Sequence, residues 1–163
     1  MKRIGLLSDT HAYWDDRYLH YFKDCDEIWH AGDIGSISII EELQKTGKEI
    51  RAVYGNIDGQ DIRGIFPLHN RFTIENVPVW ITHIGGYPTK YNPSIVAELK
   101  KNPPMLFICG HSHITKVMYD KSLRMLHINP GAAGKQGFHA VRTLIRFVIE
   151  KDTIKELEVI ELT

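Results

Sequence analysis

Residues 4–11, Ile-Gly-Leu-Leu-Ser-Asp-Thr-His, decide the fold, because a short apolar run here ends abruptly in polar residues. The same break follows Ile28-Trp29, before His-Ala-Gly-Asp, and follows residues 50–54, before Gly-Asn-Ile-Asp. Short apolar runs with polar ends are typical of buried strands. Helical spacing over residues 36–46, with Gly47 as its stop, lies between the second and third runs. The resulting β-α-β-α-β order predicts a parallel sheet with right-handed crossovers.

The second half of the chain continues with further strands and one helix. Strands are expected over residues 71–76, 78–84, 105–109, 116–120, 124–129, 141–149 and 153–162, and a helix over 93–102. The runs between 116 and 149 look like antiparallel strands joined by turns. These elements predict an α/β fold of two packed sheets with helices outside. No repeat, low-complexity tract or linker divides the chain, so we expect a single domain over residues 1–163.

The composition excludes several classes of protein and names no partner by itself. With 163 residues, 43% of them hydrophobic, the chain can close a sizeable core. Lys+Arg 20 balances Asp+Glu 20, so no overall field favours nucleic acid or a membrane surface. No apolar run approaches the ~18 residues of a membrane span. Cys25 and Cys109 form no CxxC pair and indicate buried, reduced thiols, so we expect a cytoplasmic chain, with homo-oligomers left open.

Polar side chains capable of binding a metal follow the first strands. Asp9 and His11 are separated by one residue at a strand end, so both leave the same face and can reach one ion. The alternative is a turn with a helix N-cap. Asp33 follows Gly32, and glycine-flanked aspartates usually make turns. Taken singly, each of these residues leaves both interpretations open.

Two histidines after a later strand carry more weight. His111 and His113 lie in Gly-His-Ser-His, and imidazoles at this spacing have no common structural purpose. Asn56 and His83 each follow another apolar run, and an amide beside imidazoles and carboxylates suits a Mn, Fe or Zn centre. The candidate metal ligands are therefore Asp9, His11, Asp33, Asn56, His83, His111 and His113.

These motifs resemble those of the calcineurin-like metallophosphoesterase superfamily, over essentially the whole chain. Order and spacing match in Asp9-x-His11, Gly32-Asp33, Gly55-Asn56-x-Asp58, His83 after a strand, and Gly110-His111-x-His113. The short length and Asn129-Pro130-Gly131 resemble its small, single-domain phosphodiesterase branch of bacteria and archaea. The resemblance implies a β-sandwich flanked by α-helices in four layers, α/β/β/α, and hydrolysis of phosphate esters.

The resemblance also implies a role for each candidate ligand. One metal would be bound by Asp9, His11 and His113, a second by Asn56, His83 and His111, with Asp33 bridging them. The cofactors would be two divalent ions, with Mn²⁺ expected and Zn²⁺, Fe²⁺ or Ni²⁺ as alternatives. Two cations would neutralise a phosphodiester and lower the pKa of the attacking water, and the catalytic residues would be Asp33, Asn56 and His83.

One departure from the family concerns proton donation. Many members carry His after the motif asparagine, where it can protonate the leaving oxygen, but this chain has Ile57. The general acid is therefore unassigned. Asp58 is expected to hold the loop or a ligand imidazole, with a plain turn as the alternative.

Weaker candidates lie outside these motifs. The segment that begins Asn129-Pro130-Gly131 could present backbone N–H groups to a phosphate, or form a tight turn between strands. His139 follows it and could meet an anion or simply lie on a loop. His30 and His127 are expected to be core histidines with satisfied hydrogen bonds.

Two functions of different classes remain. The first is a hydrolase of small phosphate esters, chiefly phosphodiesters, with a nucleotide-type diester left open. The second is a non-catalytic protein-binding scaffold on the same fold, as in the retromer subunit. Scaffolds tend to have lost ligands, whereas all seven positions here hold competent donors. The sequence therefore favours the enzyme.

Overall fold

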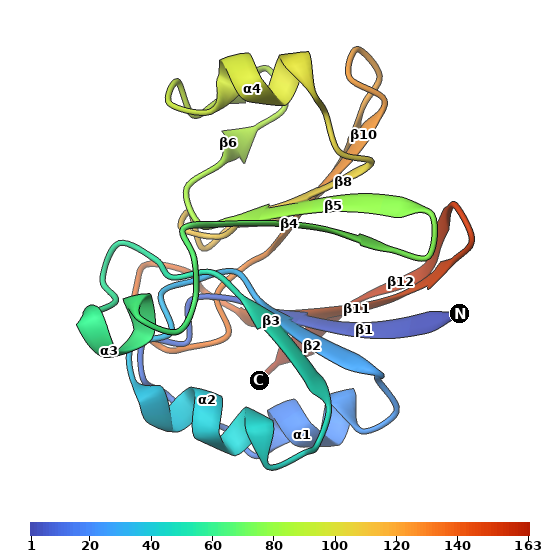
Figure 1. Cartoon of the computed structure of the whole chain (residues 1–163). Coiled ribbons are helices and arrows are strands. Elements are labelled where there is room, and N and C mark those ends of the chain that lie inside the picture. The colour runs from blue at the N-terminus through green and yellow to red at the C-terminus, as the bar shows by residue number, and fades with distance from the viewer.

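Two five-stranded β-sheets pack face to face in the computed structural model, which describes residues 1–163 (Figure 1). The first sheet has the order β12-β11-β1-β2-β3 and the second β4-β5-β8-β10-β9. Helices α1 and α2 lie below the first sheet in Figure 1, and α4 lies above the second. This arrangement confirms the predicted α/β sandwich of four layers.

The first sheet contains the strands predicted from the opening apolar runs. Its parallel strands are β1 (Lys2–Leu7), β2 (Glu27–His30) and β3 (Glu49–Ala52), and its antiparallel strands are β11 (Arg142–Glu150) and β12 (Thr153–Leu162). Leu7 pairs with His30 and His30 pairs with Ala52, so the parallel strands end level with one another. The loops that follow them therefore leave from one edge of the sheet.

The second sheet has a parallel centre and antiparallel edges. β5 (Val77–Thr82), β8 (Leu106–Ile108) and β10 (Met125–Pro130) are parallel, and β4 (His69–Ile74) and β9 (Thr115–Asp120) flank them. A small hairpin of β6 (Gly86–Tyr87) and β7 (Lys90–Tyr91) stands outside this sheet and was not predicted.

The expected run of three consecutive antiparallel strands is wrong at its last member. β9 and β10 do pair antiparallel, but β10 has β8 on its other side, so both of its edges are occupied. β11 instead crosses to the first sheet and pairs with β1 and β12. This crossover joins the two halves of the sandwich.

The helices are short, and all but α3 cover the outer faces of the sheets (Figure 1). They are α1 (Arg17–Phe22), α2 (Ile37–Gln44), α3 (Gln60–Arg63) and α4 (Val96–Lys101). The side chain of Ser36 accepts a hydrogen bond from the Ser38 N–H and begins α2, and Gly47 follows its end at φ 74°. No helix has the length and apolar character needed to span a membrane.

Apolar side chains fill two main layers. One lies between the sheets, around Ile4, Trp29 and Phe147, and the other lies between the first sheet and helices α1 and α2, around Phe22 and Ile40. Alternating inward residues of both sheets give the first layer its packing. The predicted buried thiols are confirmed, since Cys25 and Cys109 are both buried and free.

Candidate metal centre

The candidate ligands gather where strands of both sheets end. Asp9 and His11 follow β1, Asp33 follows β2, and Asn56 follows β3. His83 follows β5, and the pair His111 and His113 follows β8. Because carboxyl ends of parallel strands meet at one sheet edge, packing the two sheets brings both sets of loops together. The structure thus places all seven residues at one site.

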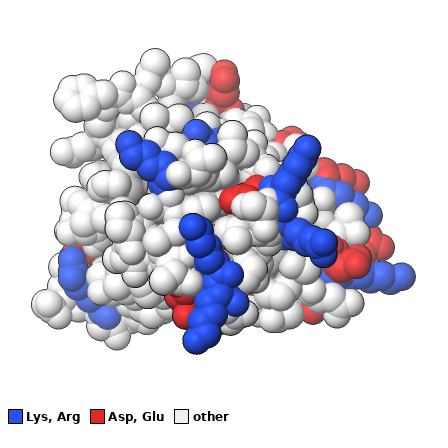
Figure 2. All heavy atoms as spheres, turned by 90° about the horizontal axis from the view of Figure 1, so that it is seen from above, with Lys and Arg blue, Asp and Glu red and all other residues white.

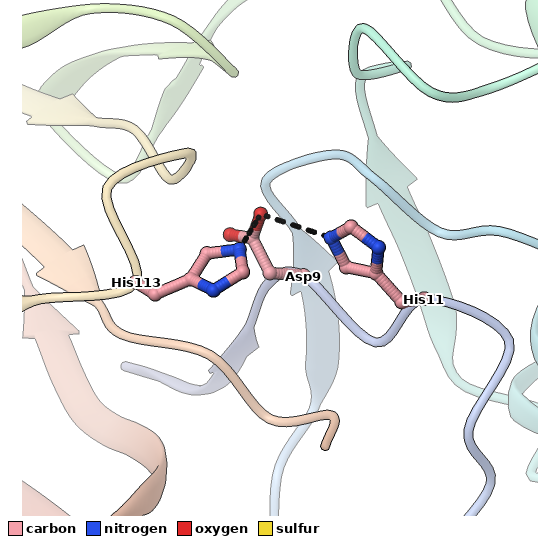
Figure 3. Close-up of side chains that lie close together, drawn as sticks. All are labelled: Asp9, His11 and His113. Atoms are coloured by element: carbon pink, nitrogen blue, oxygen red, sulfur yellow. Dashed lines mark hydrogen bonds and ion pairs between the residues drawn. The ribbon is translucent and has the colours of Figure 1, made fainter. Parts of the chain in front are cut away.

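The first group consists of Asp9, His11 and His113 (Figure 3). Their donor atoms all lie within 4.8 Å of one another. Nε2 of His113 is 3.1 Å from Oδ1 of Asp9, and Nε2 of His11 is 3.8 Å from the same oxygen. Figure 3 shows the two rings on either side of Asp9, each turning a nitrogen toward its carboxylate. This is a three-donor arrangement of the kind that binds a divalent ion.

The second group consists of Asp33, His83 and His111, whose donor atoms also lie within 4.8 Å of one another. Nε2 of His83 is 3.1 Å from Oδ2 of Asp33. Asn56 is beside this group, with its Oδ1 3.1 Å from Nδ1 of His111. Oδ2 of Asp33 is also 3.4 Å from Nε2 of His11, so this carboxylate lies between the two groups.

The buried imidazoles fit a bound cation. Nδ1 of His83 is 2.7 Å from the Ala31 carbonyl oxygen, which can only accept, so this nitrogen carries the proton. In the neutral ring Nε2 then directs a lone pair toward Asp33. Nε2 of His83 and Nε2 of His11 are both buried without a hydrogen-bond partner. A divalent ion would satisfy both nitrogens, because imidazole and carboxylate are suitable ligands for Zn²⁺, Mn²⁺ or Fe²⁺.

The electrostatics of the site keep both carboxyl groups ionised. Burial alone would raise the pKa of Asp9, but the imidazoles of His11 and His113 hold it well below its usual range. Burial likewise opposes ionisation of Asp33, yet His83 lowers its pKa. For His83, burial lowers the pKa but the two carboxylates raise it overall. A concentrated negative charge at buried oxygens is the environment that a cation requires.

The backbone of the site lies largely in the left-handed region. Positive φ angles occur at Asp9 (54°), His11 (44°), Asp33 (53°), His111 (72°) and His113 (62°). Such conformations cost a residue other than glycine of order 1–3 kcal/mol each and cluster at functional sites. Backbone hydrogen bonds hold two of them, from the Asp9 N–H to the Gly32 carbonyl at 2.9 Å and from the His11 N–H to the Asp33 carbonyl at 3.1 Å.

Two glycines let the loops approach the carboxylates. A Cβ on Gly55 would lie 2.1 Å from Oδ1 of Asp33, and a Cβ on Gly110 would lie 2.7 Å from Oδ2 of Asp9. No side chain fits at either distance. Steric contact with the two carboxylates therefore explains why glycine precedes Asn56 and His111.

Asp58 fastens two ligand loops together. Its Oδ2 accepts hydrogen bonds from the N–H groups of Ile34 at 3.1 Å and Gly55 at 2.8 Å, and its Oδ1 accepts from Gly35 at 2.8 Å. These amides belong to the loops after β2 and β3. Of the two contacts expected for Asp58, the structure shows the one to the loop, and its carboxylate makes no hydrogen bond to an imidazole.

Asn129 holds the loop that carries His111 and His113. Its Nδ2 donates to the Gly110 carbonyl at 2.9 Å and to Oγ of Ser112 at 3.1 Å, while its Oδ1 accepts from the Gly131 N–H at 2.9 Å. The N–H groups of Ala133 and Gly134 donate to carbonyls of Ser8 and Asp9. Because these donors point into the protein, the segment acts as a brace between strand ends.

His139 lies against the first group. Its Nε2 donates to the Gly134 carbonyl at 2.8 Å, and its ring packs edge to face on His113 with centroids 5.1 Å apart. Sequence reasoning missed Ser8, whose hydroxyl donates to Oδ2 of Asp9 at 2.6 Å. Its only signal was its place next to Asp9.

The two expected core histidines differ. His30 is buried and satisfied, since its Nδ1 accepts from the Gly32 N–H at 3.1 Å and its Nε2 is 3.0 Å from Oγ1 of Thr10. For His127 the core position is confirmed, but its hydrogen bonds are incomplete. Its Nε2 is 4.0 Å from Sγ of Cys109, and its Nδ1 has no hydrogen-bond partner.

Comparison with protein families and with curated proteins identifies relatives. A family model described as the calcineurin-like phosphoesterase superfamily domain matches residues 1–152. A phosphodiesterase of Methanocaldococcus jannaschii is 28% identical over 144 residues, which cover 79% of this chain and 82% of that protein. A Methanothermobacter thermautotrophicus protein named "Probable metallophosphoesterase" is 31% identical over 138 residues, covering 79% of this chain and 76% of that protein.

Solved structures share the fold along nearly the whole chain. An archaeal phosphodiesterase superposes with a TM-score of 0.78 at 26% identity, covering 98% of this chain and 99% of that one. Vps29 of Entamoeba histolytica, solved with Zn²⁺, superposes with a TM-score of 0.74, covering 98% of each chain. At 15% identity the second likeness shows the fold alone. From its family match and its relatives, this chain belongs to the calcineurin-like phosphoesterase superfamily.

Proposed function

We propose that this chain is a phosphodiesterase that hydrolyses small phosphate diesters with two divalent metal ions. The position of Asp33 carries this proposal, because its Oδ2 lies 3.1 Å from Nε2 of His83 and 3.4 Å from Nε2 of His11. A carboxylate within reach of two donor groups is suited to bridge two ions. The ligands would be Asp9, His11 and His113 for one ion and Asn56, His83 and His111 for the other.

The chain supplies orientation around this centre. When bound, the two ions would neutralise the phosphate, orient it, and lower the pKa of the attacking water. The N–H of Ile57 donates to Oδ1 of Asp33 at 3.0 Å, which leaves Oδ2 directed at the imidazoles. His111 is exposed, so a substrate can approach the second group from solvent. The mixed oxygen and nitrogen donors suit Mn²⁺, Zn²⁺, Fe²⁺ or Ni²⁺, and the family resemblance makes Mn²⁺ our first choice.

The donor set also separates this proposal from a scaffold role. A protein-binding scaffold on this fold needs no metal ligands, whereas this chain keeps all seven donors, in two groups of three with Asn56 beside the second. The catalytic role proposed for Asp33, Asn56 and His83 follows from their place in and beside the second group of donors, which would hold the second ion.

Metal removal and one substitution test the proposal. Stripping the protein with a chelator should abolish hydrolysis of bis(4-nitrophenyl) phosphate, and adding Mn²⁺ back should restore it. Asp33→Asn should lower the metal content. It should also lower the rate of hydrolysis by more than the roughly 10–100-fold loss that is typical of residues that only orient metal ligands. Asp61→Asn, an exposed carboxylate on α3, is the matched control. Full turnover by stripped protein, or unchanged metal content in Asp33→Asn, would refute the mechanism.

A further inference from the structure

A pocket of about 400 Å³ opens next to the candidate metal centre. It lies between the β6–β7 hairpin and the outer face of the second sheet, on the α4 side of the molecule (Figure 1). Its walls include Tyr87 and Tyr91 from the hairpin, His127 from β10, and His111 from the second group of ligands. The volume is in the range of small-molecule sites. A molecule bound here would touch the residue that faces the second ion.

The hairpin wall of this pocket is built into the fold. The Tyr91 hydroxyl donates to Oδ2 of Asp120 at 2.5 Å and ties the hairpin to the end of β9. Asn92 donates from its side chain to the Ile84 carbonyl at 2.7 Å and from its backbone to the Gly85 carbonyl at 3.0 Å. Because these bonds exist without a ligand, binding would require little ordering of the wall.

An incompletely bonded polar side chain lines the pocket. His127 is 1% exposed, and its Nδ1 has no hydrogen-bond partner. Its ring lies beside Phe107, with centroids 5.7 Å apart. Burial, reinforced by the charge of Lys116, lowers the pKa of His127 to about 4, so the ring is neutral at neutral pH. A buried polar group without a partner is costly, and a polar ligand atom that reached Nδ1 from the pocket would satisfy it.

The charges of the pocket are all positive. Lys90 and Lys116 line it, and no Asp or Glu does. Nζ of Lys116 lies 4.4 Å from the ring centroid of Tyr87, so it reaches across from β9 to the hairpin. Figure 2 views the molecule from this side and shows Lys and Arg standing among uncharged atoms, with most acidic side chains toward the right of the view. Such a pocket attracts an anionic group.

We propose that this pocket holds the organic group of the diester and selects a nucleotide-sized group with its own negative charge over a neutral or smaller one. The proposal rests on the proposed phosphodiesterase function. The reacting phosphate would lie by His111, the ring of the organic group between Tyr87 and His127, and its second anion by Lys116. Tyr87, His127 and Lys116 would determine specificity, and no step of the hydrolysis depends on these three side chains.

Three 4-nitrophenyl diesters with one common leaving group test the selectivity. The second alcohol esterified to the phosphate is methanol in the first, the 5′-hydroxyl of thymidine in the second, and the 5′-hydroxyl of thymidine 3′-phosphate in the third. We expect kcat/KM to rise in that order. Lys116→Met should lower the ratio of the 3′-phosphate ester to the thymidine ester about fivefold, as for a partly exposed charge contact. Lys121→Met, an equal loss of charge outside the pocket, should leave that ratio unchanged. His127→Phe should lower the ratio of the thymidine ester to the methyl ester.

Equilibrium binding separates this proposal from the proposed function. Calorimetry would measure the affinity of thymidine 3′,5′-bisphosphate for the purified protein and for both lysine variants, with folding checked by thermal unfolding. Weaker binding in Lys116→Met alone would support the pocket even if no ester is hydrolysed. Equal affinities for the bisphosphate and equal ester ratios in the two lysine variants would overturn the proposed pocket. This would hold even if the methyl ester is hydrolysed and the metal centre is upheld.

Discussion

Replacing Asp58 tests whether the ligand loops depend on a single carboxylate. Asp58 is 4% exposed and accepts three backbone N–H bonds, from Ile34, Gly35 and Gly55. Ile34 follows the candidate bridge Asp33, and Gly55 precedes the candidate ligand Asn56. The substitution Asp58→Asn keeps the size of the side chain but turns one of its two acceptor atoms into a donor, which would face a backbone donor.

The magnitude follows from the bonds that are lost. A hydrogen bond to a charged group contributes roughly 1.5–3 kcal/mol, and an unsatisfied buried N–H costs roughly 1–3 kcal/mol. Asp58→Asn loses at least one of three bonds and the charge in the others, so we expect a loss of roughly 2 kcal/mol in the free energy of unfolding. Asp58→Ala removes all three and should cost roughly 4 kcal/mol. Typical domains have about 5–15 kcal/mol, so Asp58→Asn should still fold.

Urea unfolding and elemental analysis give the two readouts. Asp58→Asn should shift the unfolding midpoint and lower metal content, because the loops that place Asp33 and Asn56 are no longer tied. Asp61→Asn, whose carboxylate accepts only from the Ile62 N–H at the exposed start of α3, should change neither. If Asp58→Asn unfolds at the wild-type midpoint and retains its metals, Asp58 is an ordinary turn residue and this reasoning fails.

Three further predictions concern single side chains. Ile57 is 47% exposed, so the fold should tolerate Ile57→His. The new imidazole would supply a general acid, worth ~10²–10⁴-fold, and should speed the hydrolysis of alkyl esters more than that of nitrophenyl esters. An unchanged slope of log rate against leaving-group pKa would contradict this prediction. Without metal, His113→Gly should be more stable than His113→Ala by about 1 kcal/mol in thermal unfolding, because φ at His113 is 62° and glycine adopts this conformation without strain. Equal melting temperatures of the two variants would mean that the backbone is unstrained. Burial holds the pKa of His127 at about 4 in the folded protein, so the unfolded chain binds the proton first as the pH falls. The free energy of unfolding should therefore fall by up to roughly 3 kcal/mol between about pH 6.5 and pH 4. Urea unfolding midpoints across this pH range should vary less in His127→Phe.

Much of the first sheet was predictable because its central strands β1 and β2 are largely buried on both faces. Such strands read as continuous apolar runs, and the polar residues Ser8, Asp33 and Asn56 follow soon after their ends at Leu7, His30 and Ala52. Parallel pairing then places Asp9 and Asp33 at one edge. Periodicity alone could not add His83 and His111, because they follow strands of the second sheet and reach the site only through packing between the sheets. Their expected roles came from the family resemblance.

Other features had no local signal. The crossing of β11 to the first sheet depends on which strand edges remain free after β8, β9 and β10 have paired. The β6–β7 hairpin consists of two-residue strands, too short for an alternating pattern. The unpaired Nδ1 of His127 depends on surroundings from three strands and the hairpin. The sequence around His127 shows only a histidine among apolar neighbours, and such a histidine is ordinarily buried with its hydrogen bonds satisfied.

The energetics of the centre argue for a role that depends on metal. Asp9 and Asp33 are 0% and 3% exposed, and five candidate ligands have left-handed backbones. The left-handed backbones oppose folding, and the two buried carboxylates depend on the imidazoles, or on a bound cation, to offset the cost of their burial. A ligand that binds only the folded state stabilises it by about 2.7 kcal/mol at 100 times its dissociation constant, which offsets part of this cost. A surface that only held another protein would gain nothing from buried carboxylates clustered with imidazoles. The cost is explained if the ions are bound and used.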